Sequence, residues 1–118
     1  MHLARQSSSG DRRTWLIAIA GDVPIGVVQG RRRPPSDLLV FSMWVDPRYR
    51  RWGVGSALID AVMGWARSSG GRRVVLWVFA ANEGAIRFYQ HLGFTLEADT
   101  DDAKSGSRYG ALAMSRSL

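Results

Sequence analysis

The chain contains no cysteine and only two histidines, His2 and His91. Disulfide bonds and thiolate metal sites are therefore excluded, and two histidines are too few for a histidine metal cluster. We expect no metal cofactor. The lack of cysteine also fits a protein of the reducing cytoplasm.

Long apolar runs are missing as well. The longest, Val74–Ala81, is far shorter than the roughly 20 residues that cross a bilayer. The apolar stretch Trp15–Ala20 follows a pair of arginines, but a secretory signal needs a core of roughly 7–15 apolar residues. We therefore expect a cytoplasmic protein with no membrane partner.

What is present is an ordinary globular composition, with 46% hydrophobic and 22% charged residues in a chain of 118. This composition predicts a single domain over residues 1–118. Residues 1–13 are polar, and we expect them to be disordered.

The net charge is +6, and much of the excess lies in arginine runs such as Arg31–Arg33. Such runs are typical of solvated loops or strand edges, and the charge alone permits several anionic partners. A nucleic-acid partner is disfavoured because Trp44, Trp65 and Trp77 lie in apolar patterns. Nucleic-acid surfaces instead interleave exposed aromatic residues with basic ones.

Apolar periodicity and turn signals predict a hairpin, then a strand, a helix, a strand, a helix and two final strands. The central strand–helix–strand unit implies a parallel strand pair with a right-handed crossover, and the ends are antiparallel. The predicted fold class is therefore α+β, a mixed sheet covered by helices. The predicted strands are 14–20, 25–29, 38–45, 74–79, 94–97 and 109–114, the predicted helices are 53–69 and 82–92, and the predicted loops include 30–37 and 99–107.

The most informative stretch joins a buried strand to the first helix and reads Arg50-Arg51-Trp52-Gly53-Val54-Gly55-Ser56. A helix N-terminus carries unpaired N–H groups and a partial positive charge. Gly53 and Gly55 let an anion approach the backbone, and Arg50 and Arg51 add full charges. Together these features predict a pyrophosphate site. No Gly-Lys-Ser/Thr follows, so it is not a Walker loop, and Leu58 occupies the third glycine position of the dinucleotide fingerprint.

This loop, Arg50-x-x-Gly53-x-Gly55, resembles the acetyl-CoA signature of the GNAT superfamily of N-acetyltransferases. A second family block is similar to Asn82-x-x-Ala85-x-x-Phe88-Tyr89-x-x-Leu92-Gly93-Phe94. The resemblance covers residues 15–114. The segment from Met43 to Pro47 further resembles small bacterial members that modify free amines or protein N-termini.

The resemblance implies an acyl-CoA N-acyltransferase fold and acetyl-CoA as the cosubstrate. It implies that the pantetheine arm pairs with the backbone of Met43 and Val45. It also implies that the pyrophosphate is held by Arg50 and by the main-chain N–H groups of the residues that follow it, which are Arg51, Trp52, Gly53, Val54, Gly55 and Ser56.

Tyr89 stands where the family often places its general acid, which protonates the departing sulfur. From the residues alone, Tyr89 also fits a core tyrosine with its hydroxyl at the surface. Asn82 suits two roles that are compatible, because its side chain can cap the second helix and still face the CoA arm.

The sequence departs from the family pattern in two ways. The strand 38–45 carries no carboxylate, so the base is Asp37, ordered water or a residue not identified. The family's first strand and the two helices after it have no counterpart in residues 1–13, which predicts an N-terminally truncated domain. It is then a minimal member, a chain completed by a partner, or a fragment. An exposed edge at strand 14–20 would favour a homodimer.

Two functions remain open at this point. The first is an N-acetyltransferase that transfers the acetyl group of acetyl-CoA to a primary amine of a small molecule, a protein N-terminus or a lysine. The second is a CoA-binding module without turnover. The sequence does not identify the amine-bearing acceptor.

Overall fold

A computed structural model describes residues 1–7 and 12–118. In these residues one seven-stranded sheet has the order β1-β2-β3-β4-β5-β7-β6. None of the described helices is long and apolar enough to span a bilayer. The strands are β1 (His2–Ser7), β2 (Arg13–Ala20), β3 (Val23–Arg33), β4 (Asp37–Val45), β5 (Arg73–Phe79), β6 (Thr95–Leu96) and β7 (Ala111–Ser117), and the helices are α1 (Val54–Ser68), α2 (Glu83–His91) and α3 (Asp101–Ser107).

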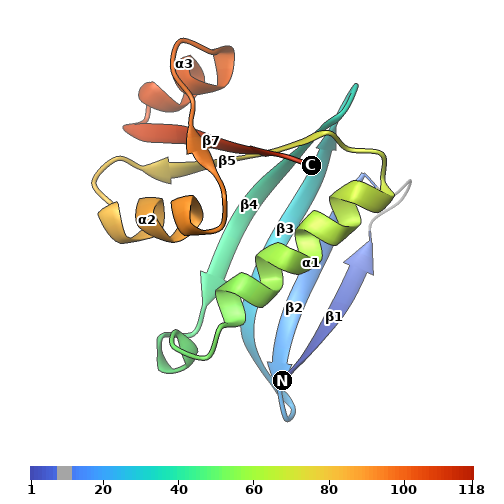
Figure 1. The fold of residues 1–118 in the computed structure, drawn as a ribbon. Helices are drawn as coiled ribbons and strands as arrows, with labels where there is room; N and C mark the ends of the chain where they lie inside the picture. The colour runs from blue at the N-terminus through green and yellow to red at the C-terminus, as the bar shows by residue number, and fades with distance from the viewer. Residues whose placement is uncertain (8–11) are drawn as a thin grey trace.

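The sheet is mixed, as the sequence predicts. Strands β1 to β4 pair antiparallel, β4 pairs parallel with β5, and β5, β7 and β6 are again antiparallel. The parallel pairing joins only Asp37–Leu39 to Arg73–Val75. Beyond it the two strands diverge, and Figure 1 shows β5 turning away from β4 towards α2. The predicted parallel unit and its splayed C-terminal ends are confirmed.

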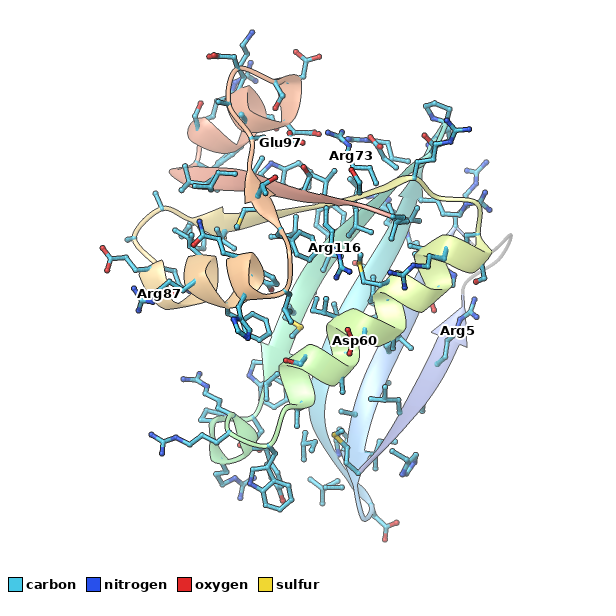
Figure 2. The ribbon with its side chains drawn as sticks, in the orientation of Figure 1. Arg5, Asp60, Arg73, Arg87, Glu97 and Arg116 are labelled. Atoms are coloured by element: carbon cyan, nitrogen blue, oxygen red, sulfur yellow. The ribbon has the colours of Figure 1, made fainter. Side chains whose placement is uncertain are left out.

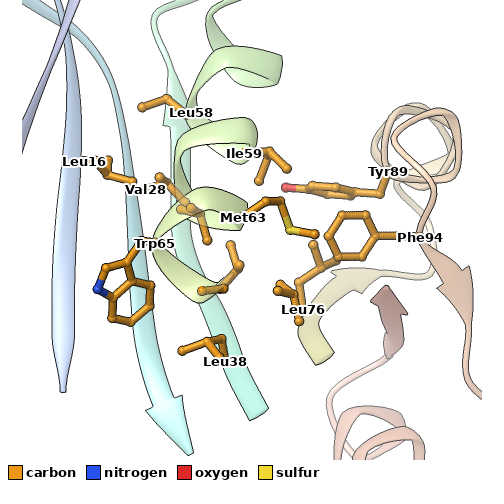
Figure 3. Close-up of a cluster of buried hydrophobic side chains, with 14 of the residues drawn as sticks. Leu16, Val28, Leu38, Leu58, Ile59, Met63, Trp65, Leu76, Tyr89 and Phe94 are labelled. Atoms are coloured by element: carbon orange, nitrogen blue, oxygen red, sulfur yellow. The ribbon is translucent and has the colours of Figure 1, made fainter. Parts of the chain in front are cut away.

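Helix α1 buries its apolar stripe against one face of the sheet. Leu58, Ile59 and Met63 on this helix lie in one core cluster with Val28 of β3 and Leu76 of β5. Figure 3 shows Tyr89 and Phe94 closing the same cluster from the side of α2. Helix α3 lies on the opposite face, where its Asp102 carbonyl oxygen accepts a 3.0 Å hydrogen bond from the Trp77 indole. Side chains alternate along β5, so Trp77 and Leu76 point to different faces.

The N-terminal residues correct the prediction of disorder. His2–Ser7 form a strand that pairs along the whole of β2, from His2 opposite Ile19 to Ser7 opposite Thr14. The chain therefore has a first strand, and β1 rather than β2 is the edge of the sheet. Residues 8–11, which the predictions of disorder and of missing helices also cover, lie outside the residues that the structure describes.

Two predicted loops are also wrong. Strand β3 continues through Arg33, because the arginine run pairs with the start of β4. Residues 101–107 form α3, capped by the Thr100 hydroxyl on the Ala103 N–H. Trp44, predicted in an apolar environment, is 50% exposed. In each case a tertiary partner, or its absence, outweighed the local pattern.

The arginine runs gather at one end of the sheet. They line a hollow of about 500 Å³ at the start of β4 and the end of α1. Its arginines are Arg12, Arg13, Arg31, Arg32 and Arg33, and its other lining residues are Pro34, Pro35, Ser36, Asp37, Leu38, Ser69, Gly70 and Gly71. This hollow shares no lining residue with the cleft at the other end of β4.

Candidate active site

A cleft of about 1070 Å³ opens where β4 and β5 diverge. Its walls come from β4, β5, the N-terminus of α1, α2 and the segment around α3. The cleft brings together eight of the predicted site residues, which are Met43, Val45, Arg50, Gly53, Gly55, Ser56, Asn82 and Tyr89. Residues that are far apart in the sequence therefore surround one opening.

The N-terminus of α1 faces this cleft without a side-chain cap. Gly53 is the capping residue, and the first main-chain bond of the helix runs from the Ala57 N–H to the Gly53 oxygen at 3.0 Å. The N–H groups of Val54, Gly55 and Ser56 thus have no partner within the helix. A helix end of this kind binds anions through these groups and its dipole.

The two glycines serve this end in different ways. Gly53 has a φ of +72°, a left-handed conformation that an L side chain rarely adopts. Gly55 has no such conformational need, but a Cβ there would stand 3.2 Å from both the Met43 methyl and the Phe88 ring. The lack of a side chain at Gly55 therefore keeps the floor of the cleft open.

The basic loop divides into residues that line the cleft and residues that do not. Arg50 lines it and is exposed, whereas Arg51 and Trp52 are exposed outside it. The Trp52 ring stands edge-on to Tyr49, 5.0 Å between centroids. Val54 is fully buried, so only its main chain is available to a ligand. The structure thus brings eight of the eleven predicted residues to the cleft and leaves these three side chains out.

Strand β4 contains a bulge that the sequence did not reveal. Val27 pairs with Trp44 and Gln29 with Phe41, so Ser42 and Met43 together oppose Val28. Ser42 takes a φ of 56°, which is strained for a residue other than glycine. Because pairing with β5 ends at Leu39, the β5-facing main chain of β4 is free of strand partners along the cleft. A serine flanked by apolar residues carries no signal for such a bulge.

Tyr89 is held in the wall of the cleft. Its side chain is 7% exposed, and its ring packs edge-on against Phe88 and Phe94. Figure 3 shows the hydroxyl end directed towards α1, near Ile59 and Met63. Among the described residues its hydroxyl makes no hydrogen bond. Burial raises the pKa of the Tyr89 hydroxyl, so the group stays protonated at neutral pH and can donate.

Asn82 has the predicted capping role. Its side-chain oxygen accepts a 3.1 Å hydrogen bond from the Ala85 N–H at the start of α2. Asn82 also lines the cleft, so the second predicted role is compatible with its position.

The candidate base Asp37 does not lie in the cleft. It accepts hydrogen bonds from Arg33 at 2.8 Å and from Arg73 at 3.1 Å, and it lines the arginine hollow at the far end of β4. The Arg73 and Arg33 guanidinium groups hold the pKa of Asp37 below its ordinary value. A carboxylate stabilised in this way is a poor proton acceptor, and we discard it as the base.

These features, a split parallel pair, a bulged strand and an uncapped glycine-rich helix end, define an acyl-CoA-binding fold. Comparison with known families agrees. The acetyltransferase (GNAT) family model matches residues 2–94, so the chain belongs to this family.

Individual relatives agree with this assignment. An uncharacterised N-acetyltransferase of Methanocaldococcus jannaschii is 46% identical over 55 residues, which are 47% of this chain and 24% of that protein. Ard1 from Thermoplasma volcanium is 29% identical with a TM-score of 0.77, over 88% of this chain and 70% of Ard1. The PaiA N-acetyltransferase from Thermoplasma acidophilum, solved with coenzyme A, shares the fold with a TM-score of 0.77 at 20% identity, over 91% of this chain and 62% of PaiA.

Proposed function

We propose that this chain is an acetyl-CoA-dependent N-acetyltransferase acting on a primary amine of a small molecule, a protein N-terminus or a lysine. One observation carries the proposal. The uncapped end of α1, the open edge of β4 and the Tyr89 ring meet in a single cleft. The first two suit a nucleotide-linked thioester, and the third supplies a protonated donor beside them.

The cleft fits acetyl-CoA by three tests. Main-chain N–H groups of α1 are available for the pyrophosphate, with Arg50 beside them. A Cβ at Gly55 would fill the cradle. The free edge of β4 offers Met43 and Val45 main-chain groups to a pantetheine amide. Acetyl-CoA supplies an acetyl group activated as a thioester.

The chain's own residues account for the remaining chemistry. Main-chain N–H groups on the free edge of β4 stabilise the negative charge that develops on the thioester oxygen. Tyr89 donates its hydroxyl proton to the sulfur as the C–S bond breaks and the N–C bond forms. The amine gives up its proton to water, because no carboxylate or imidazole is among the described residues that line the cleft.

The second candidate is a CoA-binding module without turnover, and the lack of a carboxylate or imidazole among the described residues that line the cleft favours it. Release of free thiol from acetyl-CoA in the presence of an amine panel, run beside calorimetric binding of CoA, separates the two. Amine-dependent thiol release supports the enzyme. Tight CoA binding with no release above the amine-free rate for any amine would support the module.

A further inference from the structure

The cleft has an end that the CoA-holding residues do not occupy. On the α3 face of the sheet it is lined by Phe41, Trp77, Phe79 and Tyr109, which we call the aromatic end. The main chain of Ser105 and Gly106 in α3 completes it. The CoA-holding residues belong to the α1 and α2 side, so the aromatic end is where an acceptor would approach.

Two of these rings are fixed in place. Phe41 and Trp77 bridge the diverging strands as a stacked pair, 5.9 Å between centroids and 13° between planes. The Trp77 indole donates to the Asp102 oxygen, and a Cβ on Gly106 would stand 2.8 Å from its ring. The main chain of α3 therefore presses directly on Trp77 and holds a flat aromatic surface.

The other two rings are unusually exposed for their size. Phe79, the last residue of β5, is 67% exposed, and Tyr109, in the turn after α3, is 78% exposed. A ligand that stacks on them would remove apolar area from water, which favours binding by about 25 cal/mol for each Å².

The aromatic end offers no negative charge to a cation. Arg50 is the one charged residue among the described residues that line the cleft. Two acids near α3 are already paired, since Asp102 accepts from Arg33 and Glu97 accepts from Arg73. Asp99 and Asp101 are exposed and are not among the residues that line the cleft. Figure 2 shows Arg73 and Glu97 beside each other, at the start of β5 and therefore at the other end of that strand from Phe79. A polycation would lose its hydration at the aromatic end without gaining a counter-ion.

We propose that the acceptor is a small monoamine carried on a flat aromatic group, and that polycationic amines are excluded. This inference rests on the proposed acetyltransferase function. The ring of the acceptor stacks on the aromatic end, and its amine points between β4 and β5 towards Tyr89.

The first test compares three amines, 2-phenylethylamine, butylamine and spermidine. We measure thiol release from acetyl-CoA and, separately, calorimetric binding of each amine to the protein saturated with CoA. We expect 2-phenylethylamine to exceed butylamine by at least about tenfold in kcat/KM and in affinity, the scale of one aromatic contact with its buried area. Spermidine should be the poorest of the three.

The second test uses variants at exposed positions, where a substitution changes the stability of the fold little. Phe79→Ala should raise KM for 2-phenylethylamine by about tenfold and leave butylamine unchanged. Trp44→Ala is the matched control, because Trp44 is also an exposed ring next to the cleft but does not line it. Tyr109→Asp should raise the affinity for spermidine, since it supplies the missing negative charge.

The outcomes separate the two proposals. Turnover of spermidine above 2-phenylethylamine, or equal loss in Phe79→Ala and Trp44→Ala, overturns the acceptor class and leaves the acetyltransferase standing. Binding of 2-phenylethylamine at the aromatic end without any turnover overturns the enzyme, and the acceptor role of the amine with it. No binding and no turnover for any amine overturns both.

Discussion

Replacing Gly55 by aspartate should strongly weaken CoA binding. The new side chain would start in the floor of the cleft, 3.2 Å from the Met43 methyl and the Phe88 ring, beside the free N–H groups of α1. A carboxylate about 4 Å from one phosphate charge costs about 1 kcal/mol in water and about 4 kcal/mol at the effective dielectric near a protein surface. CoA affinity should therefore fall by roughly fivefold to 1,000-fold.

The assay is isothermal titration calorimetry with CoA, beside thermal unfolding of each variant. Gly55→Ala separates volume from charge and should weaken binding only a few-fold, because the atoms it meets are the ends of side chains. Gly64→Asp is the matched control, since Gly64 lies on the same helix and a Cβ there would have no atom within 4 Å. If Gly55→Asp unfolds normally and binds CoA like Gly64→Asp, the pyrophosphate site is not at this helix end.

Two further predictions concern the site, one concerns the ion pairs of Asp37 and Asp102, and one concerns the edge of the sheet. Tyr89→Phe should lower kcat by roughly 10²–10⁴-fold and leave CoA affinity and melting temperature unchanged, as stopped-flow kinetics and calorimetry would show. Equal losses of stability and activity would instead support a packing role. Arg50→Ala should weaken CoA binding mainly at low salt, and an equal effect at 1 M salt would contradict an exposed charge contact. Neighbouring guanidinium groups hold the pKa of Asp37 and of Asp102 below the ordinary 3.8. The contribution of these two carboxylates to the free energy of unfolding is therefore complete above about pH 4 and is lost as pH falls through the lowered pKa. Urea unfolding between pH 6 and 2 should show this loss of stability, and Asp102→Asn should make it smaller. Strand β1 (His2–Ser7) is the edge strand of the described sheet and should pair two chains into a homodimer, which a monomer in sedimentation at high concentration would refute.

The sequence predicted the α1 end of the cleft well, because that end is built from local chemistry. A helix start with Gly53 and Gly55 needs no distant partner to be recognised. The same holds for Asn82, whose capping bond spans three residues. These features follow from main-chain geometry that neighbouring residues determine.

The other end could not be predicted in the same way, because it depends on tertiary partners. Helix α3 contains two aspartates, a glycine and two serines, and it forms where Asp102 meets Arg33 and Arg73 from other strands. His2–Ser7 has little apolar alternation and becomes a strand because β2 offers it an open edge. The Ser42 bulge is a mismatch in register between two strands, which neither strand encodes alone.

The network that joins α3 to the sheet has a consequence for the two ends of the cleft. Arg33 and Arg73 pair with Asp37, Asp102 and Glu97, and these residues come from five segments of the chain. Helix α1, in contrast, is attached to the sheet by an apolar core. Salt weakens attraction between partly exposed charges and leaves apolar contacts intact or stronger. The attachment of α3 to the sheet should therefore weaken in concentrated salt, while the packing of α1 on the sheet does not. Substitutions in the network should then change the position of α3 at the aromatic end without disturbing the apolar core beneath α1.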